Sequence, residues 1–129
     1  MKSEFKIKYC ILAQYWGVEK EEDISPTLTQ DEVEELWDEY SDELYDYLYE
    51  FREGEVQTDV EAPYSRHYES QSVAAQLPNG EWVGWVYWYG GGKHGNAEEI
   101  DWIEYAYDLE CKEEEKLVVV RTFTKKECD

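Results

Sequence analysis

The hydrophobic and polar positions of the chain follow two different rhythms. In residues 29–54 the apolar side chains recur every three or four positions, which places them on one face of a helix. This apolar stripe consists of Val33, Leu36, Trp37, Tyr40, Leu44, Tyr47, Leu48 and Phe51. Thr29 and Glu32 have the spacing of a capping box, and Gly54 suits a left-handed helix end. The pattern therefore predicts one long amphipathic helix.

Alternation of apolar and polar residues predicts strands elsewhere. Residues 4–16 alternate, so we expect a strand with one buried face. Residues 66–77 and 81–89 flank the turn signal at residues 77–80 and predict a hairpin. Both faces of its second arm are apolar, which favours a central strand or one that covers a partner surface. The apolar run at residues 117–124 predicts a last strand in an inner position.

A second helix is expected at residues 97–109, where Asn96 and Glu99 resemble another capping box. A strand over residues 101–107 is the competing interpretation, because these positions also alternate. The resulting order is β-α-β-β-α-β in a single α+β domain spanning residues 1–129. A four-stranded antiparallel sheet with two helices, as in the split βαβ or ferredoxin-like arrangement, fits this order. The sequence leaves the strand order open.

The charge of the chain is strongly negative and local. The net charge is −20, and residues 21–62 contribute −16 of it through 17 acids and one base. A halophilic protein would spread acids over its whole surface, so that explanation is weakened. A field of this sign repels nucleic acid and anionic membranes and attracts basic protein surfaces.

The acids gather on the outward face of the predicted first helix. Eleven carboxylates fall in residues 31–53, a rise of about 33 Å, or one charge per about 3 Å. One strand of B-form DNA carries a phosphate per about 3.4 Å. Like-charge pairs at helical spacing cost the helix on the order of 2–5 kcal/mol in total before screening by salt. A merely solvated face would explain the acids but not the near absence of lysine.

Tyr45 and Tyr49 lie among these acids on the helical wheel. They are either amphipathic residues tolerated at a surface or rigid anchors for a partner, whose arginines could stack on the rings. We expect Glu35, Asp38, Asp42 and Asp46 to be central to binding. The full predicted partner-binding set is Asp31, Glu34, Glu35, Asp38, Glu39, Asp42, Glu43, Asp46, Glu50, Glu53, Tyr45 and Tyr49.

The acidic, tyrosine-rich segment TQDEVEELWDEYSDELYDYLYEFREG resembles, in charge pattern, the DNA-mimic inhibitors made by phages and mobile elements. Proteins of that class occupy the nucleic-acid groove of restriction enzymes, CRISPR effectors or related defence proteins. The resemblance implies a non-catalytic inhibitor that binds a basic DNA- or RNA-binding protein in the host cytoplasm. The class has no common fold and no shared binding residues.

Two alternatives remain at this stage. An immunity protein or antitoxin that neutralises a basic nuclease would use the same electrostatics. A small nucleotide- or phosphate-binding protein could instead use the Gly90–Gly95 loop, where Lys93, His94 and bare backbone amides would attract an anion. This loop lacks the Walker ending, and a mobile connection is the favoured explanation of its glycines.

The remaining residue types indicate no catalytic centre. His67 and His94 are the only histidines, and neither they nor Cys10, Cys111 and Cys128 have metal-ligand spacing. We therefore expect no enzyme activity, metal or cofactor. Without a secretory signal or a membrane span, we expect reduced thiols in a cytoplasm. The sequence leaves a homodimer open as an alternative to a monomer.

Overall fold

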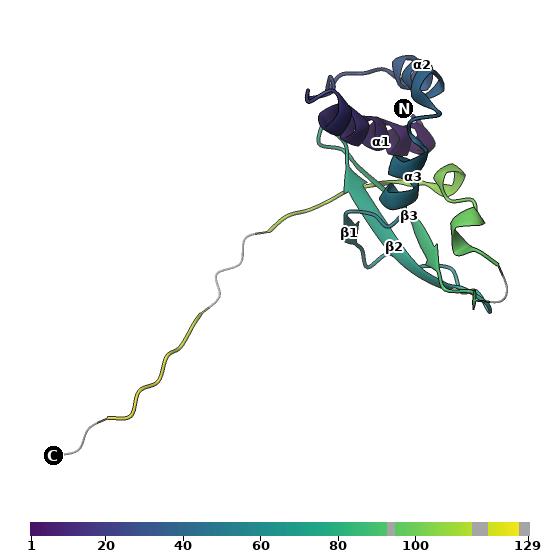
Figure 1. Cartoon of the computed structure of the whole chain (residues 1–129). Coiled ribbons are helices and arrows are strands. Elements are labelled where there is room, and N and C mark those ends of the chain that lie inside the picture. Colours follow the sequence, from purple (N-terminus) through teal and green to yellow (C-terminus); the bar gives the residue numbers. More distant parts are fainter. Residues whose placement is uncertain (93–94, 115–118, 127–129) are drawn as a thin grey trace.

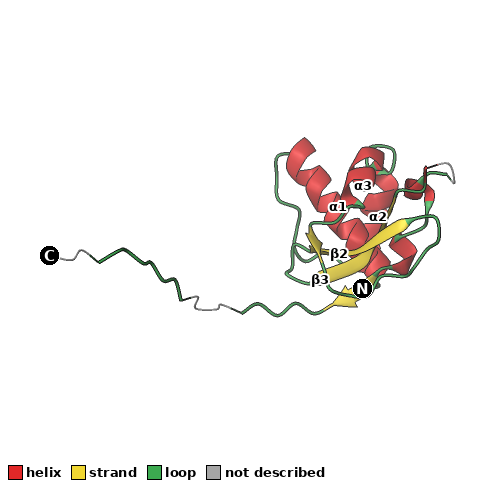
Figure 2. Cartoon of the chain, turned by 90° about the horizontal axis from the view of Figure 1, so that it is seen from below, coloured by secondary structure: helices red, strands yellow, loops and turns green. Residues whose placement is uncertain are grey.

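The computed structural model in Figure 1 describes residues 1–92, 95–114 and 119–126 and has an α+β fold. Its helices precede its sheet along the chain, and in Figure 2 they lie over one face of that sheet. The sheet is an antiparallel meander with strand order β1-β2-β3-β4. The elements are α1 (Ser3–Glu19), α2 (Gln30–Tyr40), α3 (Tyr45–Phe51), β1 (Val56–Gln57), β2 (Glu69–Gln76), β3 (Trp82–Tyr89), the 3₁₀ turns η2 (Ala97–Glu99) and η3 (Ile103–Tyr105), and β4 (Tyr107–Leu109).

The α+β class and the four-stranded antiparallel sheet were predicted and are confirmed, but the predicted element order was wrong. The described residues form three α-helices instead of two, and all three come before the first strand. An α-α-α-β-β-β-β order has no helical crossover between strands, so the arrangement is not ferredoxin-like.

The first element was predicted as a strand at residues 4–16 and is instead the helix α1. Buried apolar side chains occur all around this helix, among them Ile7, Tyr9, Cys10, Ile11 and Leu12. A helix that packs against other elements on all sides has apolar residues at most positions, so its sequence can also show the alternation typical of a strand. Here those elements are the sheet, α2 and α3. A run of this length also exceeds the usual strand of about 5–6 residues, which favours a helix.

The predicted long helix is divided into α2 and α3 by a turn at residues 41–44. Its predicted apolar stripe is nevertheless confirmed, because all eight residues are buried or half-buried in the core. The capping box is also present, with the Thr29 side chain accepting a hydrogen bond from the backbone nitrogen of Glu32 at 3.3 Å. At the turn, the hydroxyl of Ser41 donates to the carbonyl of Asp38 at 3.3 Å, which competes with regular helix hydrogen bonds.

The predicted hairpin is confirmed as β2 and β3. Its turn is closed by a 2.8 Å hydrogen bond from the Leu77 amide to the Glu81 carbonyl. β3 is central, with β2 and β4 on its two sides. Val83 and Trp85 are fully buried in the core, whereas Val86 and Trp88 lie on the opposite face of the strand and are half-buried.

The predicted helix at residues 97–109 was wrong. The segment contains η2 and η3 and then pairs with β3 as the short strand β4. Asn96 makes no side-chain cap. Tyr107 and Leu109 pack over Gly84 so closely that a Cβ there would lie 2.6 Å from the tyrosine ring. This tertiary packing and the pairing with β3 outweigh the weak helical spacing.

The predicted last strand at residues 117–124 was also wrong for its described part. Residues 119–124 have no regular secondary structure, and residues 117–118 lie outside the described part of the chain. The side chains of Val119, Val120 and Phe123 are about four-fifths exposed (79%, 82% and 86%). The helices of the described part fall short of the length and apolar character that a membrane crossing requires.

Candidate functional site: an acidic ridge on α2 and α3

The eleven carboxylates of residues 31–53, which we term the acidic ridge, are all solvent-exposed. The apolar stripe turns α2 and α3 toward α1 and the sheet, so the acids between the stripe positions point outward. The predicted partner-binding residues are therefore at the surface, including Tyr45 and Tyr49, which are 72% and 46% exposed.

No acid of the ridge forms an ion pair with a lysine or arginine in the described part of the chain. The ion pairs there belong to Lys6, which contacts Glu81 at 2.8 Å and Asp108 at 3.0 Å and ties α1 to the β2–β3 turn and β4. The hydrogen bond and charge of Lys6 hold the pKa of Glu81 below its usual range. The ridge thus keeps its negative charge uncompensated by direct pairs.

Two lysines of the helical layer rest on aromatic rings. The ammonium of Lys8 lies 4.9 Å from the ring centre of Phe5 and 5.4 Å from that of Trp37. Lys20, at the end of α1, lies 4.8 Å from Trp16 and 5.0 Å from Tyr40. These cation–π contacts occupy the two cations without an ion pair to a ridge carboxylate.

Arg52 is the one base within residues 21–62, and it turns toward the sheet. Its guanidinium carbon lies 5.0 Å from the ring centres of both Tyr49 and Tyr87. Its Nη1 donates to the carbonyl of Trp88 at 2.9 Å, and its own carbonyl accepts from Nε1 of Trp85 at 2.8 Å. Arg52 therefore joins α3 to β3.

Glu32 and Glu43 of the ridge have partners within the protein. Glu32 serves the capping box, as its Oε1 accepts from the Thr29 amide at 3.2 Å. Glu43 accepts a 2.5 Å hydrogen bond from the hydroxyl of Tyr15 in α1. This bond, together with burial, raises the pKa of Tyr15 to about 12. Glu43 was predicted as a partner-binding residue, but its carboxylate is directed toward α1.

The turn at residues 41–44 divides the ridge into two segments, a feature that the single predicted helix did not include. The backbone of the turn stays right-handed, with φ/ψ of −53°/−40° at Ser41 and −86°/−8° at Leu44. Amide hydrogen bonds from Glu43 and Leu44 to the Tyr40 carbonyl, at 2.9 and 3.1 Å, bridge it. Exposed acids flank the turn on both sides, so charge continues across it.

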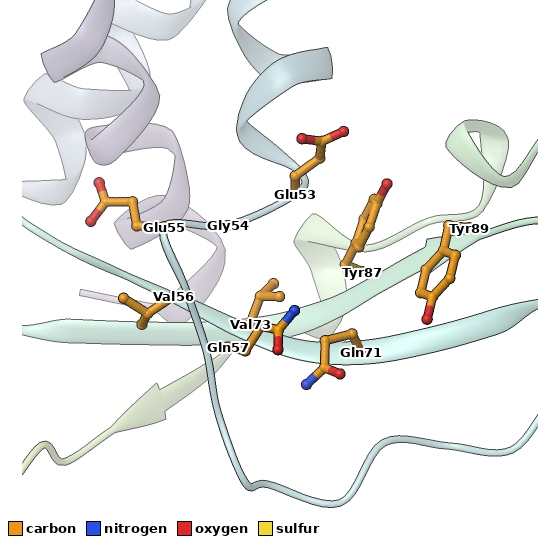
Figure 3. Close-up of a pocket in the computed structure, with 9 residues that line it drawn as sticks. All are labelled: Glu53, Gly54, Glu55, Val56, Gln57, Gln71, Val73, Tyr87 and Tyr89. Carbon is orange, nitrogen blue, oxygen red and sulfur yellow. The ribbon is translucent and has the colours of Figure 1, made fainter.

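A pocket at the end of the ridge was not predicted from the sequence. It has a volume of about 410 Å³ and lies between the chain that leaves α3 and the uncovered end of the sheet (Figure 3). Its lining residues are Glu53, Gly54, Glu55, Val56, Gln57, Gln71, Val73, Tyr87 and Tyr89. These residues come from three separate segments, so no local motif marks them; only the alternation of β2 and β3 indicates which of them share a face.

The glycine-rich loop, predicted as an alternative anion site, is described only in part. Lys93 and His94 lie outside the described residues. Gly90, Gly91, Gly92 and Gly95 all have positive φ, which accounts for glycine there by backbone geometry alone.

The structure identifies no metal or thiol centre in the part of the chain that it describes. That part contains no group of three or more histidine, cysteine, aspartate or glutamate side chains placed to hold a metal ion. Cys10 is buried, which raises its pKa to about 12 and opposes thiolate formation. Cys111 is exposed, and Cys128 lies outside the described residues.

Comparisons of the chain with protein-family models, curated proteins and solved structures find no match.

Proposed function

We propose that this protein is a non-catalytic inhibitor whose acidic ridge imitates a nucleic-acid backbone and blocks the groove of a basic nucleic-acid-binding protein. The observation that carries the proposal is the exposed row of carboxylates on α2 and α3, without a lysine or arginine paired to any of them in the described residues. A partner that binds phosphates offers arginine and lysine at similar spacing, and carboxylates can pair with these groups.

The exposed tyrosines favour a binding surface over a merely solvated one. Tyr45 lies among the acids with 72% of its side chain exposed, although burying a tyrosine ring is normally favourable. Aromatic residues are enriched at the centres of protein interfaces, where they also stack on arginine. Tyr45 and Tyr49 would thus add contact area to a surface whose charges provide attraction and orientation.

The test is a triple charge reversal in the ridge, Asp38→Lys, Asp42→Lys and Asp46→Lys. A matched control reverses Glu98, Glu104 and Glu110, three exposed acids outside the ridge, and changes the net charge equally. Wild type and control are expected to retain a nucleic-acid-binding protein from an extract of the natural host, and the ridge variant is expected to lose it. Duplex DNA or RNA in excess should compete with the retained protein, because both ligands would occupy the same groove.

Two results would contradict the proposal. One is retention of the partner by the ridge variant at the level of wild type. The other is a ternary complex in which the partner holds its nucleic acid and this protein together.

A further inference from the structure

The pocket at the end of the ridge is lined by acidic, amide and aromatic side chains on its different sides (Figure 3). Glu53 and Glu55 stand on the segment that leaves α3, Gln57 and Gln71 form the floor, and the Tyr87 and Tyr89 rings stand on the other side. Gly54 permits this shape, because a Cβ on it would lie 2.5 Å from the Cβ of Val73. The pocket is continuous with the ridge through Glu53, which belongs to both.

The pocket presents hydrogen-bond acceptors at Glu53 and Gln71. The amide nitrogen of Gln71 donates to the carbonyls of Thr58, at 3.4 Å, and Ser72, at 3.1 Å. Since both donations use the nitrogen, the amide oxygen of Gln71 is left as an acceptor. The exposed carboxylate of Glu53 stands beside the tyrosine rings, whereas that of Glu55 accepts from the backbone nitrogen of Gln76 at 3.4 Å and points away from the rings (Figure 3). The charge of Glu53 and the amide oxygen of Gln71 disfavour an anion and favour a cation rich in donors.

The aromatic wall fits a flat cation. The Tyr87 and Tyr89 rings are stacked, with centroids 5.2 Å apart and planes inclined by 21°. The protein already places one guanidinium in this cluster, since Arg52 lies 5.0 Å from the centre of the Tyr87 ring. Burial and the nearby charge of Glu53 raise the pKa of Tyr87, which keeps its hydroxyl neutral.

We infer that this pocket accepts an arginine side chain of the protein that docks on the ridge, an inference that rests on the proposed function. A guanidinium presents five donors in a plane, so it can pair with a carboxylate and lie against a ring at once. A lysine ammonium has three donors on one atom and no flat face, so it uses the ring wall less well. The pocket would then select the partner, while the ridge supplies the general attraction to basic surfaces.

N-acetyl-arginine amide is the probe, added to the isotope-labelled protein at low salt. Binding is followed by NMR through the side-chain amide resonances of Gln57 and Gln71. We expect both resonances to shift with arginine, less with N-acetyl-lysine amide, and least with N-acetyl-citrulline amide, which keeps the shape but lacks the charge. Equal shifts for arginine and citrulline, or no shift with arginine at tens of millimolar, would overturn the inference.

Variants then separate the pocket from the ridge. Glu53→Gln combined with Tyr89→Leu is expected to weaken arginine binding by about tenfold, as one charge-assisted contact and one ring face are lost. The control pair Glu110→Gln and Tyr105→Leu, also one exposed acid and one tyrosine, should bind the probe as wild type does.

The ridge triple variant makes the two proposals fail separately. It leaves every residue that lines the pocket unchanged, so it should still bind the arginine probe. If it binds the probe and also keeps the host partner, the proposed function fails and the pocket stands. If wild type does not bind the arginine probe while the ridge variant loses the host partner, the pocket inference fails and the proposed function stands.

Discussion

Arg52 is the single base among the acids of residues 21–62, and its position decides how negative the surface remains. A basic side chain on the outward face would have paired with acids one helical turn away. The guanidinium instead contacts the rings of Tyr49 and Tyr87 and the carbonyl of Trp88. One residue thus fastens α3 to β3 without forming an ion pair with the acids around it.

The hydrogen bond from Tyr15 to Glu43 gives a pH-dependent contribution to stability. The pKa of Tyr15 is raised from 10.0 to about 12 in the folded protein, so folding favours the neutral phenol. The contribution is therefore fully present below pH 10.0 and is lost as the pH rises toward 12. Urea unfolding of wild type and Tyr15→Phe should show a stability difference at neutral pH that shrinks across this range. A difference that stays constant with pH would show that the hydroxyl contributes nothing through this bond.

Alanine substitutions at three glycines distinguish the stability cost of backbone strain from that of steric crowding. Gly54 and Gly80 both have positive φ, 77° and 93°, but only Gly54 has a neighbour that a Cβ would strike, at 2.5 Å. Gly80→Ala should cost about 1–2 kcal/mol of unfolding free energy from strain alone, and Gly54→Ala should cost more. Gly17→Ala, in the open last turn of α1, should stabilise by up to about 1 kcal/mol. Chemical denaturation measures all three, and equal losses at Gly54 and Gly80 would mean that Val73 yields to the added methyl group.

At the scale of elements, α2 and α3 tolerate strong repulsion because their inner face is anchored. The stripe from Val33 to Phe51 packs into the core, and this packing offsets the cost of like charges on the outer face. The break at residues 41–44 occurs where Ser41 competes for a backbone carbonyl and Leu44 is buried at 1% exposure.

The ridge triple variant is consequently expected to be more stable than wild type. Each new lysine replaces repulsion from acids three or four positions away, such as Glu35, Glu39 and Glu50, by attraction. Each pair gains about 0.2–0.5 kcal/mol from the repulsion removed and a similar amount from the attraction added. The total gain in unfolding free energy should be about 1–3 kcal/mol at low salt. Thermal unfolding beside the matched control measures it. A loss of stability would contradict the repulsion argument.

At the scale of the whole molecule, the net charge of −20 is unevenly distributed, and −16 of it falls within residues 21–62. Self-repulsion of this kind destabilises the folded state and is screened by salt. The screening length falls from about 10 Å at 0.1 M to about 3 Å at 1 M. Sodium chloride should therefore raise the melting temperature of wild type.

The ridge triple variant is the control for this salt effect and should gain less from sodium chloride than wild type does. Partner binding should change in the opposite direction and weaken as salt is added, since it depends on the same charges across an interface. A melting temperature that is unaffected by sodium chloride would show that the ridge carboxylates do not repel one another significantly in the folded protein.

The sequence by itself determined the features whose cause is local. The helical spacing of the stripe, the capping box at Thr29, the positive φ of Gly54 and the β2–β3 hairpin were all predicted correctly. The exposure of the ridge follows from the same periodicity, because acids between stripe positions have nowhere else to point.

The tertiary structure decided the rest, for reasons that no local pattern contains. Residues 4–16 are compatible with a strand or a buried helix, and only the sheet, α2 and α3 around α1 settle the choice. Residues 107–109 become β4 because β3 offers an edge and Gly84 leaves room for Tyr107. The pocket arises where the chain after α3 crosses β2 beside the two tyrosines of β3. The sequence alone determines the negative charge of the ridge. The packing of distant segments determines which polar and aromatic side chains lie next to that charge.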